Sequence, residues 1–403
     1  MVGLAMIENH LKYWSLKPEL ALLLDIVLRK NPRIPEGINW ADFEALLRQH
    51  RLQPLLIRGL RGMDTAHYPV LEKYRGMQNK YATESLHRLQ ALAEANGTLA
   101  EAGIRMIAMK GPLLAMELYG DPSLRTSRDL DVMVAQEDLD RAEEILLRLG
   151  YVPEENPFHK TPLRRKYYSR IEPEKHRVYN LGDICLELHW RGSFQKEDSF
   201  DALWERREEQ PIFGRKIAIM GTADRYPALI IHAAEHGFHR LRWLLDLYEL
   251  QKKPSFSWET VYAQLSDQGL GVLLLETMLV MHRLRLPGLE DVVFGGIRLT
   301  HQADGLCLAL REELCKEGKL ALQLTEAVYP MWQSEAVWAD PRHRIYDKLL
   351  PTSLIQKSLL QKFLINFGPS VYDLELIDLP DWLFWLYFII RPFHWLQRKL
   401  TGK

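Results

Sequence analysis

The stretch IRMIAMKGPLLAMELYGDPSLRTSRDLDVMV, residues 104–134, decides the fold. Its apolar start predicts a strand, Lys110-Gly111-Pro112 predicts a tight turn into a short helix, and the last residues predict a second strand. Asp129 and Asp131 are two residues apart in that second strand, so their side chains project from the same face. Adjacent carboxylates repel each other unless a positive charge lies between them, and Mg²⁺ is commonly bound in this way. The pattern therefore predicts a metal site.

These residues resemble the signature of the polymerase-β-like nucleotidyltransferase superfamily, in which a small residue opens a helix after the first strand and Asp-x-Asp follows on the second. Gly111 stands at the glycine position, and Asp129 and Asp131 form the aspartate pair. The wider pattern KGPLLA…YGDPSLRTSRDLDVMV looks like a poorly characterised bacterial branch of that superfamily. The resemblance implies an α+β fold, with a small mixed-sheet nucleotidyltransferase core flanked by N- and C-terminal helical regions. It also implies transfer of an NMP from a Mg-NTP (or Mn²⁺ complex) to a hydroxyl or similar acceptor by a two-metal mechanism.

The composition of the chain limits the class of acceptor molecule that we expect. The 403 residues include 52 Lys+Arg and 53 Asp+Glu, which leaves a formal charge of −1. Proteins that bind long tracts of nucleic acid are usually far more basic, so we expect a small or local acceptor: a small molecule, a peptide or an RNA end. The chain has no basic n-region and no CxxC motif, which favours the cytoplasm. It also has no Walker A, GxGxxG or GxSxG motif, so kinase, dehydrogenase and α/β-hydrolase assignments have no motif support.

Changes of pattern divide the chain into three regions. Residues 1–103 are predicted to form helices, and the last of these helices is predicted to end at Gly103 as its C′ glycine. Residues 104–221 show a pattern of alternating strands and helices, which predicts a core built from both. Residues 222–403 return to helical periodicity. We therefore predict a nucleotidyltransferase core between two helical regions.

A basic insertion interrupts the predicted core at residues 153–177. Seven Lys or Arg residues lie between positions 160 and 177, against Glu172 and Glu174. A flexible basic loop with aromatic residues can hold an acceptor phosphate or nucleic acid. A solvated hairpin accounts for the same composition, and the sequence leaves both interpretations open.

The strand ICLELHW, residues 184–190, supplies a third acid. Alternation puts Cys185, Glu187 and His189 on one face and apolar residues on the other. The resemblance implies a third metal-site carboxylate from a later strand, and Glu187 fits that position. Glu187 then binds the metal nearest the acceptor and can assist deprotonation of the acceptor hydroxyl. His189 orients Glu187, contacts nucleotide or packs as a structural polar group.

Lys110, Gly111, Arg125 and Arg128 are the predicted nucleotide-binding residues. Gly111 lets the backbone approach the phosphates, and the following helix offers free N–H groups to an anion. Pro112 stands where the superfamily has serine, so a hydroxyl contact is absent and Lys110 or backbone groups must replace it. The two arginines either reach phosphate or neutralise the aspartate pair.

Other functions remain open from the sequence alone. The first is a catalytically inactive nucleotide-binding module, and the second is an RNA-modifying transferase that uses the basic insertion. The third is a zinc peptidase, because His232-Ala-Ala-Glu235-His236 matches an HxxEH pattern on a predicted helix. Asp246 is predicted to pair with a base such as Arg242, one turn before it.

The aromatic C-terminal segment, residues 381–403, is predicted to pack as a helix, to dock a partner or to contact a membrane surface. Its uninterrupted apolar run covers residues 382–390 and is far shorter than the roughly 20 residues needed to span a bilayer.

Overall fold

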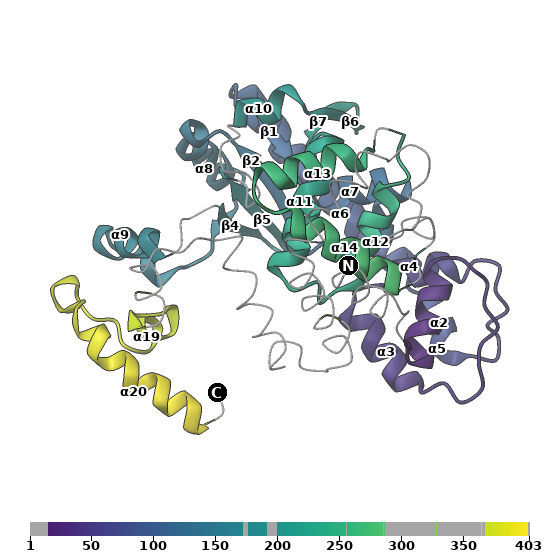
Figure 1. The fold of residues 1–403 in the computed structure, drawn as a ribbon. Coiled ribbons are helices and arrows are strands. Elements are labelled where there is room, and N and C mark those ends of the chain that lie inside the picture. The colour runs from purple at the N-terminus through teal and green to yellow at the C-terminus, as the bar shows by residue number, and fades with distance from the viewer. Residues whose placement is uncertain are drawn as a thin grey trace, which may run out of the picture.

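The computed structural model describes residues 15–171, 176–191, 200–254, 256–284, 286, 328, 364 and 367–401 (Figure 1). Residues 172–175 of the predicted insertion lie outside the described residues, as does most of 285–366 in the predicted C-terminal region. The described residues form an α+β structure, as predicted, in which helices precede and follow a mixed sheet.

Within the described residues, five helices precede the sheet: α2 (Pro18–Val27), α3 (Trp40–Gln49), α4 (Gln53–Gly59), α5 (Pro69–Arg75) and α6 (Gln78–Glu101). The break between α3 and α4 falls just before Pro54, because proline is tolerated in the first turn of a helix but not in its interior. Helix α6 ends before Gly103, whose φ of +73° is the left-handed conformation expected of a C′ glycine. The amide of Ile104 then donates to the carbonyl of Leu99 and closes the helix end.

Seven strands of the described chain form one sheet: β1 (Met106–Ala108), β2 (Asp129–Val134), β3 (Val152–Pro153), β4 (His176–Leu181), β5 (Ile184–His189), β6 (Glu208–Ile212) and β7 (Arg215–Ile219). Their order is β3-β4-β5-β2-β1-β7-β6. The β1–β7 and β2–β5 pairs are parallel, and the others are antiparallel. The central pair β2–β5 therefore runs with both strands in the same direction, so equivalent side chains lie side by side.

The helices connecting these strands are short. They are α7 (Pro112–Tyr119), η1 (Pro122–Leu124), η2 (Gln136–Asp138), α8 (Leu139–Arg148), η3 (Pro157–His159), α9 (Pro162–Ile171) and α10 (Phe200–Glu205). After the sheet come α11 (Thr222–Glu235), α12 (Leu241–Leu250), α13 (Trp258–Asp267) and α14 (Gly271–Arg283). The start of the predicted C-terminal helical region forms the two helices α11 and α12, because the chain turns at Gly237, whose φ is +61°.

The two faces of β2 have opposite environments. Leu130, Val132 and Val134 are buried in a core shared with α6 and α8. The other face carries Asp129, Asp131 and Met133, and Met133 packs into the core that contains α11, α12 and α14. Figure 1 shows these later helices in front of the sheet. The aspartate pair therefore lies on the face toward the C-terminal helices.

The described part of the basic insertion forms helix α9 rather than the flexible loop or solvated hairpin expected from its composition. Phe158 and Tyr167 pack with Leu374, Phe384 and Tyr387 in a separate small core. Leu374 belongs to α19 (Val371–Leu376) and Tyr387 to α20 (Leu386–Thr401), while Phe384 directly follows η5 (Asp381–Leu383). These elements lie beside α9 in Figure 1. The insertion is ordered because its apolar face is covered by a segment more than 200 residues later in the chain.

The C-terminal segment also presents apolar side chains to solvent. Trp382, Trp385, Ile389 and Phe393 are between 53% and 75% exposed. None of the helices in the described residues has the length and apolar character needed to span a bilayer. Contact of residues 381–403 with a partner or a membrane surface stays a prediction.

Candidate functional site

The turn between β1 and α7 brings Lys110 to the aspartate strand. Gly111 precedes the helix with φ +77° and ψ −150°, a backbone conformation that is strongly unfavourable for any residue other than glycine. Pro112 occupies the first turn of α7, as predicted, where its missing N–H costs no helical hydrogen bond. A Cβ on Gly111 would lie 3.7 Å from the carbonyl oxygen of Asp129, so the turn packs closely against the start of β2.

The parallel register of β2 and β5 brings the predicted acids together. Asp131 pairs with Glu187, and Asp129 pairs with Cys185, on the same face of the two strands. Ile184, Leu186 and Leu188 are buried on the opposite face, which confirms the alternation predicted for β5. Three carboxylates, those of Asp129, Asp131 and Glu187, therefore line one strip of the sheet.

Lys110 links this strip to helix α11. Its Nζ lies 3.7 Å from Oδ1 of Asp131 and 3.2 Å from Nδ1 of His232. Burial lowers the pKa of His232 far below its ordinary value, and the charges of Lys110 and His236 lower it further. The imidazole of His232 is therefore neutral and accepts a hydrogen bond from the lysine.

Two histidines surround Glu187. Nε2 of His189 lies 3.3 Å from Oε2 of Glu187 and 3.5 Å from Oδ1 of Asp131. Nε2 of His176, on β4, lies 3.8 Å from the same Glu187 oxygen. The sequence analysis did not identify His176. Counting back from the Gly182-Asp183 turn pairs it with His189, so the hairpin register held the necessary signal.

The charges around Asp131 keep it ionised despite its burial. Burial alone would raise the pKa of Asp131, but the charge of Lys110 and the imidazole of His189 hold it below its ordinary value. Burial alone would lower the pKa of His189, and the carboxylates of Asp131 and Glu187 raise it above its ordinary value. Lys110 and His189 thus supply positive charge that the acidic strip requires.

Cys185 borders the strip as a half-buried free thiol. Burial raises its pKa to about 11, and the neighbouring carboxylates of Glu187 and Asp129 act in the same direction. The thiol is therefore protonated near neutral pH and is a poor nucleophile.

Asp246 is a buried acid paired with a base, as predicted, but that base is Arg125 and the prediction of Arg242 is wrong. Oδ2 of Asp246 lies 2.9 Å from Nε of Arg125, and Oδ1 accepts a 2.8 Å hydrogen bond from Tyr119. Arg242 donates instead to the carbonyl and hydroxyl oxygens of Thr126. These contacts join the loop that leads into β2 to helix α12, since Arg125 lies on the loop and Arg242 lies on the helix. The prediction that Arg125 binds phosphate finds no support in these contacts, because its guanidinium is buried against Asp246.

Arg128 stays exposed next to Asp129, as a phosphate-binding residue would be. Arg51 and Arg240, which the sequence analysis missed, share its surroundings. Burial, together with the charges of Arg240 and Arg128, lowers the pKa of Arg51 to about 10, while the charge of Asp129 opposes the shift. The pKa of Arg240 is lowered by burial and by Arg128 in the same way. Three mutually repelling guanidinium groups near one aspartate favour an anion.

The HxxEH motif does not form a metal cluster with other described residues. His232 bonds Lys110, and His236 stacks on Trp243 at 5.4 Å between ring centroids. In the described part of the chain, the residues whose ligand atoms cluster closely enough for a metal ion are His176, Glu187 and His189.

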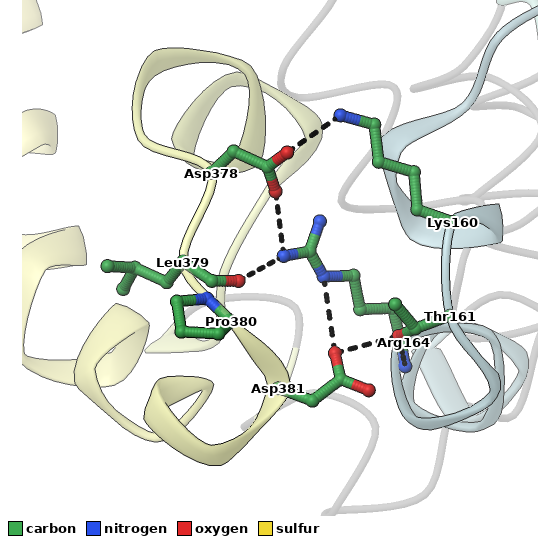
Figure 2. Close-up of a pocket in the computed structure, with 7 residues that line it drawn as sticks. All are labelled: Lys160, Thr161, Arg164, Asp378, Leu379, Pro380 and Asp381. Atoms are coloured by element: carbon green, nitrogen blue, oxygen red, sulfur yellow. Dashed lines mark hydrogen bonds and ion pairs between the residues drawn. The ribbon is translucent and has the colours of Figure 1, made fainter.

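A second charged cluster lies between α9 and the C-terminal segment, and we call it the clasp. It lines a pocket of about 330 Å³, and its residues are Lys160, Thr161, Arg164, Asp378, Leu379, Pro380 and Asp381 (Figure 2). Asp378 lies 3.0 Å from Lys160 and 2.8 Å from Arg164. Arg164 also donates to the carbonyl of Leu379 and lies 3.7 Å from Asp381. The basic residues of the insertion that the structure describes here are thus neutralised within the chain.

Comparison with known families decides the assignment. A family model described as an uncharacterised nucleotidyltransferase matches residues 36–285, more than half of the chain. The chain belongs to this nucleotidyltransferase family. The match covers the whole sheet of the nucleotidyltransferase and extends from α3 to α14.

No curated protein matches this nucleotidyltransferase. Among solved structures, it is similar to one titled as the solution structure of the antibiotic-resistance factor ANT(2'')-Ia. The two share 14% identity over 48% of this chain and 96% of that chain, with a TM-score of 0.35. A similarity this weak carries no argument about activity.

Proposed function

We propose that this nucleotidyltransferase moves an NMP from a metal-bound NTP to a hydroxyl or similar acceptor, with Asp129, Asp131 and Glu187 as its metal-site carboxylates. The observation that carries the proposal is the parallel register that sets Asp131 beside Glu187 on one face of the sheet. Family membership supports the transfer reaction, and the register supports this set of residues.

The donor set suits hard divalent cations. Three carboxylates offer oxygen ligands, which Mg²⁺ and Mn²⁺ accept. Asp131 is only 6% exposed yet ionised, so a cation stabilises it strongly. Asp129, Asp131 and Glu187 would hold the metal, which would supply positive charge against the triphosphate during an in-line displacement.

The protein groups then have separate tasks. Asp129 and Asp131 hold metal, and Glu187 holds metal on the acceptor side and accepts the proton of the acceptor hydroxyl. Lys110 exchanges its contact with Asp131 for a phosphate oxygen, while the N–H groups at the start of α7 face the same anion. Arg128, with Arg51 and Arg240, binds the remaining phosphate charge. Arg125 positions the loop through Asp246.

The contacts of the basic insertion favour a small acceptor molecule or a short acceptor segment. Lys160 and Arg164, which belong to the basic insertion, contact acids of the same chain. An RNA acceptor therefore loses two of its best candidate contacts, Lys160 and Arg164.

The test is to incubate the protein with each α-labelled NTP, Mg²⁺ or Mn²⁺ and a cell extract, and to follow the label and the released pyrophosphate. Transfer of label that requires metal supports the proposal. Binding of NTP by calorimetry with no turnover under any of these conditions favours the inactive nucleotide-binding module instead.

Lys110→Ala tests the nucleotide-binding half of the site. Loss of one charge-assisted contact is expected to weaken NTP binding by roughly 10- to 100-fold. Calorimetric titration measures this, with Lys160→Ala in the clasp as the matched control that keeps wild-type affinity. Unchanged affinity in Lys110→Ala removes this lysine from the site.

A further inference from the structure

Two imidazoles and a carboxylate meet at the end of the acidic strip. His176 and His189 face each other across the β4–β5 pair, with ring centroids 4.8 Å apart and an angle of 30° between the rings. Both direct Nε2 at Oε2 of Glu187, at 3.8 and 3.3 Å. One ligand atom from each of the three residues lies within 4.8 Å of the others.

These separations match the spacing of metal ligands. Nitrogen and oxygen ligands at about 2.0–2.2 Å from a metal lie roughly 3.0–3.6 Å from one another. The two measured separations therefore need only small side-chain movements. Nε2 of His189 is buried and makes no hydrogen bond to any described residue, although Glu187 and Asp131 lie at 3.3 and 3.5 Å. A buried nitrogen in that position is stabilised by a ligand between it and the carboxylates.

The donor types select the class of metal. Mg²⁺ prefers oxygen ligands and keeps much of its water, whereas imidazole favours Mn²⁺, Fe²⁺, Co²⁺ and Zn²⁺. We propose that His176, Glu187 and His189 form a site for a divalent first-row transition metal, adjoining the Asp129–Asp131 pair. The role of this metal on the acceptor side rests on the proposed function. The existence of the site does not, because metal binding can be measured without any turnover.

The experiment uses the full chain without a histidine tag, stripped with chelator and titrated with Co²⁺ in the absence of nucleotide. The expected result is saturable binding of one Co²⁺ per chain with visible absorption bands, which a millimolar excess of Mg²⁺ does not displace. His176→Asn and His189→Asn are each expected to weaken Co²⁺ binding by at least about tenfold. His67→Asn, on an exposed loop between α4 and α5, is the matched control and keeps wild-type binding.

Thermal melting of each variant shows that it is folded before its binding is compared. Absence of saturable Co²⁺ binding in the wild-type protein overturns the proposal, as does wild-type affinity in both histidine variants. Displacement of Co²⁺ by Mg²⁺ overturns the assignment to a transition metal. Co²⁺ binding that both variants lose, in a protein without NTP turnover, supports this site and counts against the proposed function alone.

Discussion

The acidic strip on β2 and β5 and the clasp between α9 and the C-terminal segment both gather acids and bases, but they balance charge differently. In the clasp, the negative charge of Asp378 is neutralised by ion pairs with two basic residues, Lys160 and Arg164. In the strip, the carboxylates of Asp129, Asp131 and Glu187 share the charge of Lys110 and the imidazole of His189. We propose that a cation binds the strip, because the buried carboxylate of Asp131 lies beside a second acid, Glu187, whereas the acid of the clasp already has two basic partners. We therefore expect the reaction at the acidic strip and not at the pocket of the clasp.

The largest expected difference between the two regions is in activity. Asp131→Asn removes a proposed metal ligand and is expected to lower NTP turnover by roughly 10⁴-fold or more, about 5 kcal/mol in the barrier. Asp378→Asn, the same change in the clasp, is expected to leave turnover within about twofold. Pyrophosphate release measures both, and circular dichroism shows that the folds match. Equal losses in the two variants, or retained activity in Asp131→Asn, would break the comparison.

The next largest effect concerns the buried pair behind the strip. Asp246→Asn leaves Arg125 charged in an interior where its side chain is only 4% exposed, so unfolding is expected to become easier by about 3–5 kcal/mol. Urea unfolding measures this loss. Asp378→Asn again serves as the control, because Asp378 is 56% exposed and Arg164 keeps its contacts with the carbonyl of Leu379 and with Asp381. A loss below about 1 kcal/mol in Asp246→Asn would show that the loop does not depend on this pair.

Acid should loosen the C-terminal segment at α19 and α20. Burial alone would raise the pKa of Asp373, but hydrogen bonds from Ser370 and the groups His394 and Arg391 hold it below its ordinary value. The unfolded segment has the higher pKa and binds the proton first, so the stabilisation is present above about pH 4 and is lost as the pH falls below it. Hydrogen exchange of residues 367–394 at pH 6 and pH 3 measures the change.

The control for this acid effect is Asp373→Asn, which has no carboxylate to titrate. Its protection in the C-terminal segment is expected to be lower at pH 6 and to change less between the two pH values. A wild-type segment that keeps full protection at pH 3 would contradict the assignment.

The smallest effect is expected at the rim of the clasp. Lys160→Met removes one exposed ion pair with Asp378, and such pairs contribute only about 0–1 kcal/mol. Thermal or urea unfolding should therefore change little, and NTP turnover should not change. A loss of turnover in this variant would show that the clasp takes part in the reaction and would remove the distinction between the two regions.

Local pattern predicted which strand faces carry the acids of the strip, and the family resemblance supplied the expectation that Glu187 joins the aspartate pair. Strand alternation fixed the face of Glu187, the glycine turn fixed the start of α7, and the two-residue spacing fixed the aspartate pair. Each of these features depends on neighbours within a few residues, where backbone geometry determines side-chain direction. His176 was within reach of the same reasoning through the hairpin register.

Long-range pairing was not predictable in this way. Arg125 and Asp246 are 121 positions apart, and nothing in either neighbourhood indicates the other. Asp246 was therefore assigned to the nearest base on its own helix. The insertion was misjudged for the same reason, because the apolar residues that cover α9 lie near the end of the sequence.

The distance between the two halves of the clasp has a consequence for synthesis of the protein. Lys160 and Asp378 are 218 positions apart. At a translation rate of about 5–20 residues per second, roughly 10–40 s pass between their appearances on the ribosome. During that interval Phe158 and Tyr167 have been made but their covering residues have not. Lys160 and Arg164 gain their ion-pair partner Asp378 only when the last helices have been made, at the same time as the apolar surface of α9 gains its cover.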